Sequence, residues 1–216
     1  MQRVLIIGGH GKIALQLAGI LSGAGHQVTS VIRKNEQSDR VAETGARPLV
    51  LDVETSTQTE LAAAMAGHDA VVWSAGAGGG NPERTYAVDR DAAIRSMDAA
   101  AAAGVRRYVM VSYLGARADH GIPEGHGFFA YAQSKAAADE HLRGTGLDWT
   151  ILAPGALTDE PSIGRINPSP SGSDTRTSRA SVVLVAAAVL ELPETSRKTI
   201  AFTDGEVPIA EALGGP

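Results

Sequence analysis

The chain has 216 residues, which is enough to bury one sizeable hydrophobic core. Its net charge of −5, with 44% hydrophobic and 20% charged residues, is ordinary for a globular protein and argues against a nucleic-acid partner. The absence of cysteine excludes disulfides, thiolate metal ligands and a cysteine nucleophile. The first apolar run, residues 4–7, is too short for a signal peptide, and the longest, residues 182–190, is too short for a membrane span. We therefore expect a cytoplasmic protein with no membrane partner.

Short apolar runs alternate with segments of helical periodicity along most of the chain. The runs predict strands over residues 3–7, 27–32, 48–51, 70–74, 107–111 and 149–152. The helical segments are residues 12–21, 38–44, 57–66, 84–103 and 129–143, and a glycine follows closely after each of them as a stop signal. The nearly continuous hydrophobicity of the strands indicates that both of their faces are covered. We therefore predict an α/β fold in which right-handed crossover helices cover both faces of one doubly wound parallel sheet.

The pattern loosens after Leu152. A stretch rich in proline, glycine and serine follows, and behind it we predict only a helix at 179–192 and a strand at 199–203. Because this stretch lies near the carboxyl end with so little structure behind it, it does not resemble a linker between two domains. We expect a single domain over residues 1–216, in which residues 153–178 form a small C-terminal lid on the substrate side.

A glycine-rich turn lies directly behind the first predicted strand and ahead of the first helix. Its small residues Gly8, Gly11 and Ala14 have the spacing that lets the chain turn tightly, lets the backbone approach a pyrophosphate, and lets the helix pack against its strand. The free amides at the start of such a helix attract anions. The turn therefore predicts a dinucleotide-binding site, although a glycine-rich turn without any ligand is also common.

Three polar side chains farther along the chain form a second candidate constellation. Tyr131 and Lys135 are four residues apart on a predicted helix, and Ser112 ends the fifth predicted strand, where ligands of such sheets bind. An ammonium group near a phenol lowers the pKa of the phenol and suits it to proton transfer, while the serine could hold a carbonyl. Each residue alone also fits chance spacing or turn capping, but together, behind a glycine turn, they favour catalysis. Tyr113 is an alternative proton donor.

The charged residues at the end of the second predicted strand indicate which nicotinamide cofactor the protein binds. An acidic residue there would bind the ribose of NAD, whereas this chain has Arg33 and Lys34, and cations suit the 2′-phosphate of NADP. Lys12, in the glycine turn, is a third candidate contact, equally consistent with an exposed lysine. We expect NADP(H), with a preference on the order of 10- to 100-fold from one charge-assisted hydrogen bond.

Other ionisable residues are weaker candidates. The six histidines lack the spacing of metal ligands on a shared helix face, so we expect no metal site. His10, in the glycine turn, is at most a neighbour of the phosphate. Asp89 and Arg90, on the long fourth helix, fit solvated or packing polar groups better than site residues.

Taken together, these motifs resemble the short-chain dehydrogenase/reductase superfamily, in particular its atypical NAD(P)H-binding members similar to flavin reductase and biliverdin reductase B. The resemblance covers nearly the whole chain and rests on the segments IGGHGKIA, LDVE, VWSAGAG, VSYLGA, YAQSK and ILAPGALTDEP followed by TSRASVV. It implies a Rossmann fold. Two departures are Ala14 in place of the usual third glycine and Ala153 where many relatives carry an arginine before Pro-Gly.

The resemblance also implies roles for individual residues. Tyr131 would be the acid or base, and Ser112 would orient the substrate. Asp52 and Val53 would meet adenine, and Lys135 would bind the nicotinamide ribose. The full set implied or expected at the cofactor is Gly8, Gly9, His10, Gly11, Lys12, Ile13, Arg33, Lys34, Asp52, Val53, Ala75, Gly76, Ala77, Lys135, Pro154 and Gly155.

We therefore expect an NADPH-dependent reductase that transfers hydride to a small carbonyl or similar polarised double bond of a small-molecule substrate. Two alternatives stay open. One is a non-catalytic NADP(H)-binding regulator, since some atypical members use the fold only to bind the cofactor. The other is a sugar-nucleotide epimerase or dehydratase, which is less favoured because the region after Leu152 is short for a sugar-nucleotide domain. The sequence specifies neither the substrate nor the oligomeric state.

Overall fold

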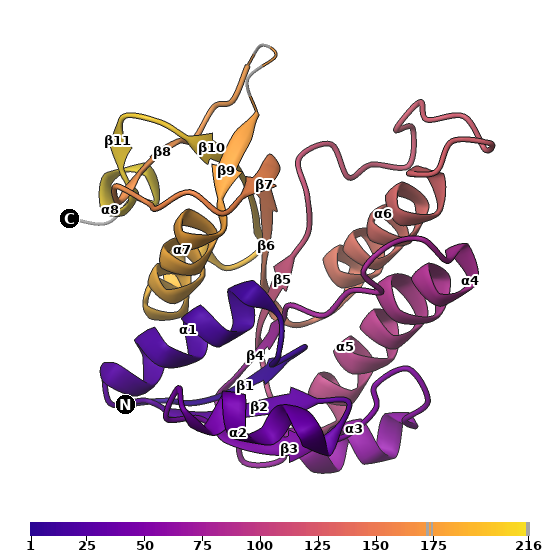
Figure 1. The fold of residues 1–216 in the computed structure, drawn as a ribbon, viewed down its shortest axis with the longest axis vertical. Helices are drawn as coiled ribbons and strands as arrows, with labels where there is room; N and C mark the ends of the chain where they lie inside the picture. The colour runs from indigo at the N-terminus through magenta and orange to yellow at the C-terminus, as the bar shows by residue number, and fades with distance from the viewer. Residues whose placement is uncertain (172, 174, 215–216) are drawn as a thin grey trace.

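Seven parallel strands form the centre of one sheet, and the predicted strands supply all of them (Figure 1). The computed structural model describes residues 1–171, 173 and 175–214. The parallel strands are β1 (Arg3–Ile7), β2 (Gln27–Ile32), β3 (Arg47–Val50), β4 (Ala70–Trp73), β5 (Arg107–Val111), β6 (Asp148–Pro154) and β10 (Lys198–Asp204). Two short strands, β8 (Arg165–Asn167) and β11 (Val207–Pro208), extend the sheet with antiparallel pairing, so that its order is β11-β8-β10-β6-β5-β4-β1-β2-β3.

Helices cover both faces of this sheet, because successive strand residues point to opposite sides. In β1, Val4 and Ile6 pack into one hydrophobic layer, whereas Leu5 and Ile7 pack into the other. The helices that cover the first layer are α1 (Lys12–Gly23), α2 (Ser38–Ala42), α7 (Arg179–Glu191) and α8 (Ile209–Ala212), and those that cover the second are α3 (Gln58–Met65), α5 (Ala93–Ala102) and α6 (Phe129–Gly144). The predicted doubly wound α/β fold is confirmed.

The helix predicted at 84–103 has the right extent but is not uniform. It consists of α4 (Pro82–Thr85), a π-helical turn η2 (Tyr86–Ala92) and α5 in succession. Hydrophobic periodicity does not reveal a single wide turn, because a π turn adds only one residue to a helix. Two 3₁₀ segments, η1 (Asn35–Gln37) and η3 (Pro193–Thr195), are also present. None of the described helices is long and apolar enough to span a bilayer.

The order of the strands reverses at β1, which lies between β4 and β2. Strands β2 and β3 are added on one side of β1, and β4, β5, β6 and β10 are added on the other. Ligands of such sheets bind at the carboxyl ends of the strands beside this reversal. The residues that follow β1 and β4 therefore lie at the crevice where a dinucleotide would bind.

The predicted lid, residues 153–178, contains more regular structure than its composition suggests. Strands β7 (Ala156–Thr158) and β9 (Arg176–Ser178) pair as a small parallel sheet, and β8 joins the main sheet against β10. Three-residue strands set among prolines and glycines are too short to produce a readable alternation. Residues 172 and 174 of the predicted lid lie outside the described residues, and the role of the segment as a lid stays a prediction.

Gly155, directly after β6, lets the small sheet approach the main one. A Cβ at this position would overlap the carbonyl oxygen of Thr175, so we expect Gly155→Ala to lower the free energy of unfolding by about 1–3 kcal/mol. Gly19→Ala is the matched control, because a Cβ there meets nothing within 4 Å in α1 and should stabilise the helix by about 0.5–1 kcal/mol. Urea denaturation measures both, and equal midpoints for the two variants would contradict the expectation.

Candidate active site

The glycine turn after β1 is pressed between the ends of two neighbouring strands. Gly8 has a φ of +85°, and a Cβ added to it would lie 2.6 Å from Ala75 Cα, just after β4. A Cβ on Gly9 would lie 2.6 Å from Ser30 Cβ in β2. A side chain at either position would push the strand ends apart, so the turn needs glycine. The backbone of the turn is left bare, as a close approach to a ligand requires.

The first turn of α1 offers peptide N–H groups to an anion. Gly11 precedes the helix in an extended conformation, and no side-chain hydrogen bond caps the helix there. The first N–H groups of a helix have no intrahelical partner, and the positive end of the helix dipole attracts phosphate. The bare turn and the uncapped helix start therefore fit the pyrophosphate of a nicotinamide dinucleotide.

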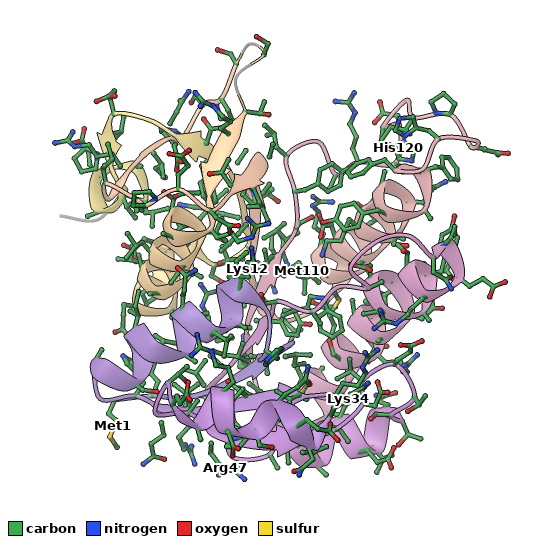
Figure 2. All side chains as sticks on the ribbon, in the orientation of Figure 1. Met1, Lys12, Lys34, Arg47, Met110 and His120 are labelled. Carbon is green, nitrogen blue, oxygen red and sulfur yellow. The ribbon has the colours of Figure 1, made fainter. Side chains whose placement is uncertain are left out.

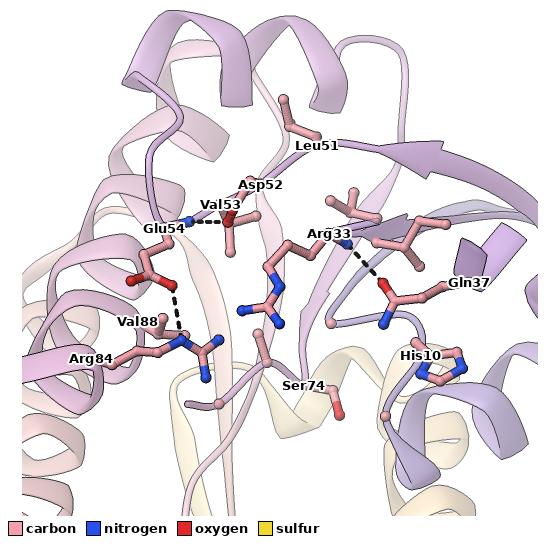
Figure 3. A pocket seen from close by; sticks show the side chains of 16 residues that line it. His10, Arg33, Gln37, Leu51, Asp52, Val53, Glu54, Ser74, Arg84 and Val88 are labelled. Carbon is pink, nitrogen blue, oxygen red and sulfur yellow. Dashed lines mark hydrogen bonds and ion pairs between the residues drawn. The ribbon is translucent and has the colours of Figure 1, made fainter. Parts of the chain in front are cut away.

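A cleft of about 350 Å³ lies at the carboxyl ends of β1 to β4 (Figure 3). The predicted cofactor residues that line it are Gly8, His10, Gly11, Arg33, Asp52, Val53, Ala75 and Gly76. The other lining residues, which sequence reasoning did not assign to the cofactor, are Val31, Ile32, Gln37, Leu51, Glu54, Ser74, Arg84 and Val88. Arg84 Nε donates to Glu54 Oε2 at 3.0 Å across 30 positions of the chain, a relation that no local pattern reveals.

Arg33 reaches into this cleft, and its guanidinium makes no ion pair with the residues that the structure describes (Figure 3). The side-chain oxygen of Gln37 accepts hydrogen bonds from the backbone N–H groups of Arg33 and Lys34, each at 3.1 Å, and so fixes the turn that carries them. Lys34 is exposed and is not one of the residues that line the cleft. The structure thus separates the two predicted cations and presents only Arg33 to a ligand in the cleft.

Lys12 and Ile13 also do not line the cleft with their side chains. Lys12 Nζ is 2.6 Å from Asp159 Oδ2, so the ammonium expected near phosphate is engaged with the segment predicted as a lid. Arg179 Nη1 approaches the other oxygen of Asp159 at 2.8 Å. The Ile13 side chain packs in the hydrophobic core, so that only its backbone could meet a cofactor.

A second cavity, of about 510 Å³, lies at the carboxyl ends of β5 and β6, the strands next to those under the cleft. The predicted site residues that line it are Ser112, Tyr131, Pro154 and Gly155, and the others are Tyr113, Leu114, Phe128, Ala156, Leu157 and Thr175. The structure therefore brings the predicted serine and tyrosine together, beside the cleft.

Lys135 lies behind this cavity rather than in it. Its side chain is 1% exposed, and its Nζ donates a hydrogen bond to the carbonyl of Val111 at 2.8 Å. The Sδ atom of Met110, which lies in the middle of the molecule (Figure 2), is 3.3 Å from the same Nζ. Burial lowers the pKa of Lys135, and the charges of Asp139 and Asp89 oppose this effect. The ammonium thus binds the end of β5, and two buried carboxylates act on it through their charges.

The effect predicted for Lys135 on the phenol of Tyr131 is therefore wrong. Burial raises the pKa of Tyr131, and the negative charges of Asp89 and Asp139 raise it further. Lys135 is not among the groups that shift the pKa of this phenol. The phenol stays protonated at neutral pH, which suits a proton donor rather than a base.

Two buried carboxylates complete the site, and sequence reasoning did not assign them a function. Ser112 Oγ donates to Asp139 Oδ2 at 2.5 Å, and the N–H of Ala77 donates to Asp89 Oδ2 at 2.9 Å. Ala77 itself follows Gly76 of the cleft but is not one of the residues that line it. Burial raises the pKa of both carboxyl groups, and the ammonium of Lys135 opposes the rise. The four-residue spacing of Lys135 and Asp139, which puts them on one face of α6, was the signal available in the sequence.

Replacing Lys135 with methionine would remove the positive charge that offsets the buried carboxylates Asp89 and Asp139. We expect the free energy of unfolding to fall by about 3–5 kcal/mol, because two buried negative charges would lose their compensation. Lys12→Met is the control, because it removes an ammonium from an exposed ion pair and should leave the unfolding midpoint almost unchanged. Urea denaturation tests both variants, and an equally small effect at Lys135 would argue against a stabilising role for its charge.

The stability deficit of Lys135→Met should grow with pH. Without the ammonium, the folded pKa values of Asp89 and Asp139 rise further above their unfolded values. A carboxyl group with a raised folded pKa contributes stability below its unfolded pKa and loses it as pH rises through the folded pKa. The variant should therefore differ least from the parent in acid and most at neutral pH, and a difference that does not change with pH would refute the assignment.

Comparison with known proteins identifies relatives along the whole chain. Residues 8–193 match the family model described as NAD(P)H-binding. A Bacillus subtilis protein named as the uncharacterised sugar epimerase YhfK is 34% identical over 213 residues, which cover 98% of each chain. A Bacillus halodurans structure described as an NAD-dependent epimerase/dehydratase is 31% identical, with a TM-score of 0.90 over 99% of each chain. The Lactococcus lactis oxidoreductase ylbE is 29% identical, with a TM-score of 0.83 over 98% of this chain and 95% of that one.

These matches agree with the glycine turn, the order of the strands and the crevice at the reversal of the sheet. The family model covers both the cleft and the second cavity, because both lie within residues 8–193. The resemblance expected from the motifs is confirmed. The chain belongs to the NAD(P)H-binding family, and its doubly wound parallel sheet is of the Rossmann type.

Proposed function

We propose that this protein is an NADPH-dependent reductase that transfers hydride to a small carbonyl or a similarly polarised double bond. The observation that carries the proposal is that the phenol of Tyr131, whose pKa burial raises, lies beside Ser112 in a cavity on the strands next to the dinucleotide cleft. A substrate in that cavity has a proton donor at hand on the side of the sheet where the cofactor binds.

The cofactor, when bound, supplies a hydride to the carbonyl carbon and is oxidised as the substrate is reduced. The glycine turn and the start of α1 would hold its pyrophosphate, and Arg33 would pair with a 2′-phosphate. As the carbonyl oxygen gains the electron pair of the broken π bond, Tyr131 donates its proton to that oxygen and an alcohol results. The raised pKa of Tyr131 keeps the proton on the phenol until the oxygen becomes basic enough to take it.

Ser112 serves this reaction differently from the carbonyl contact expected of it. Its hydroxyl proton is directed at Asp139 Oδ2, so only the lone pairs of its oxygen remain for the cavity. Ser112 can therefore accept a hydrogen bond from the phenol of Tyr131 or from the product hydroxyl, but does not donate one to the carbonyl. Asp139 acts through Ser112 as a positioning residue.

Epimerisation of a sugar nucleotide is the second candidate, since the relative YhfK carries the name of a sugar epimerase. The second cavity gives this candidate little support, because none of its described lining residues is charged and a diphosphate would find no cation there. Incubation with UDP-glucose separates the two functions. Conversion to an epimer with no net consumption of NADPH would favour the epimerase.

Cofactor preference should depend on Arg33 and much less on Lys34. We expect Arg33→Ala to weaken NADPH binding by about 10- to 100-fold, because a charge-assisted hydrogen bond to the 2′-phosphate is lost, while NADH binding changes little. Lys34→Ala removes the neighbouring cation, which does not line the cleft. Its effect on NADPH binding should be several-fold smaller than the effect of Arg33→Ala. Competitive fluorescence titration measures all four affinities. Equal affinities of the parent protein for NADH and NADPH would remove the proposed preference.

Turnover should depend on the hydroxyl of Tyr131. We expect Tyr131→Phe to lower kcat by about 10²–10⁴-fold, the usual contribution of a general acid, while the Kd for NADPH stays the same. Tyr86→Phe is the control, since the Tyr86 ring lies under the Arg90 guanidinium at 4.8 Å and does not line the second cavity. NADPH oxidation with a panel of aldehydes, ketones, quinones and flavins gives kcat.

Two results would change the assignment. Full activity in Tyr131→Phe with loss of activity in Tyr113→Phe would make Tyr113, which also lines the cavity, the proton donor. Tight NADPH binding without NADPH oxidation by any compound of the panel would favour a cofactor-sensing regulator over an enzyme.

A further inference from the structure

The second cavity is neutral and aromatic in its chemistry. No lysine, arginine, histidine, aspartate or glutamate is present in its described lining. The rings of Tyr113, Phe128 and Tyr131 stand together, with centroids 5.1–5.4 Å apart. Phe128 meets Tyr113 edge-on, at an interplanar angle of 89°. Clusters of this kind attract a further aromatic ring, because stacked and edge-on rings complement each other electrostatically.

Exposed apolar side chains border the same cavity. Phe128, just ahead of α6, is 39% exposed, and Leu157, in β7, is 40% exposed. Both line the cavity, one from the β5–α6 connection and the other from the small β7–β9 sheet (Figure 1). Apolar surface gathered around a cavity is typical of a site that binds an apolar ligand. None of the residues that the structure describes covers these two side chains completely.

The polar groups of the cavity are hydroxyls. The hydroxyl of Tyr113 is buried and has no hydrogen-bond partner among the residues that the structure describes. Burial also raises its pKa, so that it stays protonated and can donate to a neutral oxygen. The buried charge directly behind Ser112 is the carboxylate of Asp139, which repels an anion. A carboxylate or phosphate on the substrate would therefore lose its hydration and find no cation among the described residues that line the cavity; Arg117, whose charge acts on Tyr113, lies outside that lining.

We propose that the substrate of this site is an uncharged aromatic carbonyl compound, and that the cavity rejects the same ring when it carries a carboxylate or phosphate. This inference rests on the proposed reductase function and specifies its substrate class. The ring would pack against Tyr113 and Phe128, and the carbonyl would lie near the hydroxyls of Tyr131 and Tyr113. Reduction gives the alcohol, with the proton taken from Tyr131.

Three aldehydes of similar size separate the effect of charge from that of the ring. Methyl 4-formylbenzoate is uncharged, 4-formylbenzoate carries a carboxylate on the same ring, and methyl 4-formylcyclohexanecarboxylate carries the ester on a saturated ring. Ligand-observed NMR with NADP⁺ present gives the Kd of each, and NADPH oxidation gives turnover. We expect the carboxylate to bind at least about 100-fold more weakly than the aromatic ester. The saturated ester should bind about 3- to 10-fold more weakly.

A cation at the rim should change this selectivity. Leu157→Lys places an ammonium where the side chain is already partly exposed, and should reduce the preference for the ester over the carboxylate by about 10-fold. Ile163→Lys adds the same charge at a position that is 71% exposed and outside the cavity lining, so it is the matched control and should leave the preference unchanged. Circular dichroism and urea midpoints check that both variants fold.

The outcomes separate this inference from the reductase proposal. Tight binding of the aromatic ester without any NADPH oxidation would overturn the reductase and leave the ligand class standing. Equal Kd values for ester and carboxylate, or for the aromatic and saturated esters, with NADPH oxidised throughout, would overturn the ligand class and leave the reductase standing. An unchanged preference in Leu157→Lys, or an equal change in Ile163→Lys, would overturn the assignment of charge selectivity to this cavity.

Discussion

The buried ammonium of Lys135 links the two halves of the site. It holds the carbonyl of Val111 at the end of β5, and its charge is balanced by Asp89 and Asp139. Asp139 holds Ser112 beside the second cavity, and Asp89 holds the backbone of the loop that follows β4 and borders the cleft. One cation on α6 therefore holds the end of β5 and compensates the charges of the carboxylates that hold Ser112 and the loop after β4. Such a buried cluster contributes more to geometry than to net stability, because each charge gives up hydration to enter it.

The cleft and the second cavity differ in the charge of the residues that line them. Among the described residues, two arginines line the cleft; Arg84 is paired with Glu54, and Arg33 makes no ion pair there. The cavity beside it is lined by rings, aliphatic groups and hydroxyls. A polyanionic cofactor and an uncharged substrate would each find a matching surface. Parallel strands make this division possible, because all their carboxyl ends lie along one edge of the sheet.

Local patterns in the sequence were sufficient to predict the main elements and the glycine turn. Hydrophobic periodicity and turn glycines depend on residues close in the chain, so the seven parallel strands and the small residues from Gly8 to Ala14 could be recognised before the fold was known. Membership of the family followed from the same motifs. The short strands β7, β8 and β9 were missed because three residues carry almost no periodic signal.

Local sequence patterns could not predict the electrostatic interactions between the ionisable groups of the site. Whether Lys135 acts on Tyr131 or on carboxylates depends on which elements pack against α6, and Asp89 comes to it from η2, far away in the chain. The spacing of Tyr131 and Lys135 predicted a lowered phenol pKa, yet burial and two carboxylates raise it. Tertiary packing thus decides the protonation state that the local motif leaves open.

The close packing at Gly155 limits how this site can diverge. The Thr175 carbonyl occupies the space that a Cβ would need, so this part of the wall admits only glycine. Phe128 and Leu157, by contrast, have open solvent beside them. Homologues that acquire new substrates should therefore accumulate their changes at these two positions while the glycine stays invariant, and a mutant library meant to redirect selectivity is best built there.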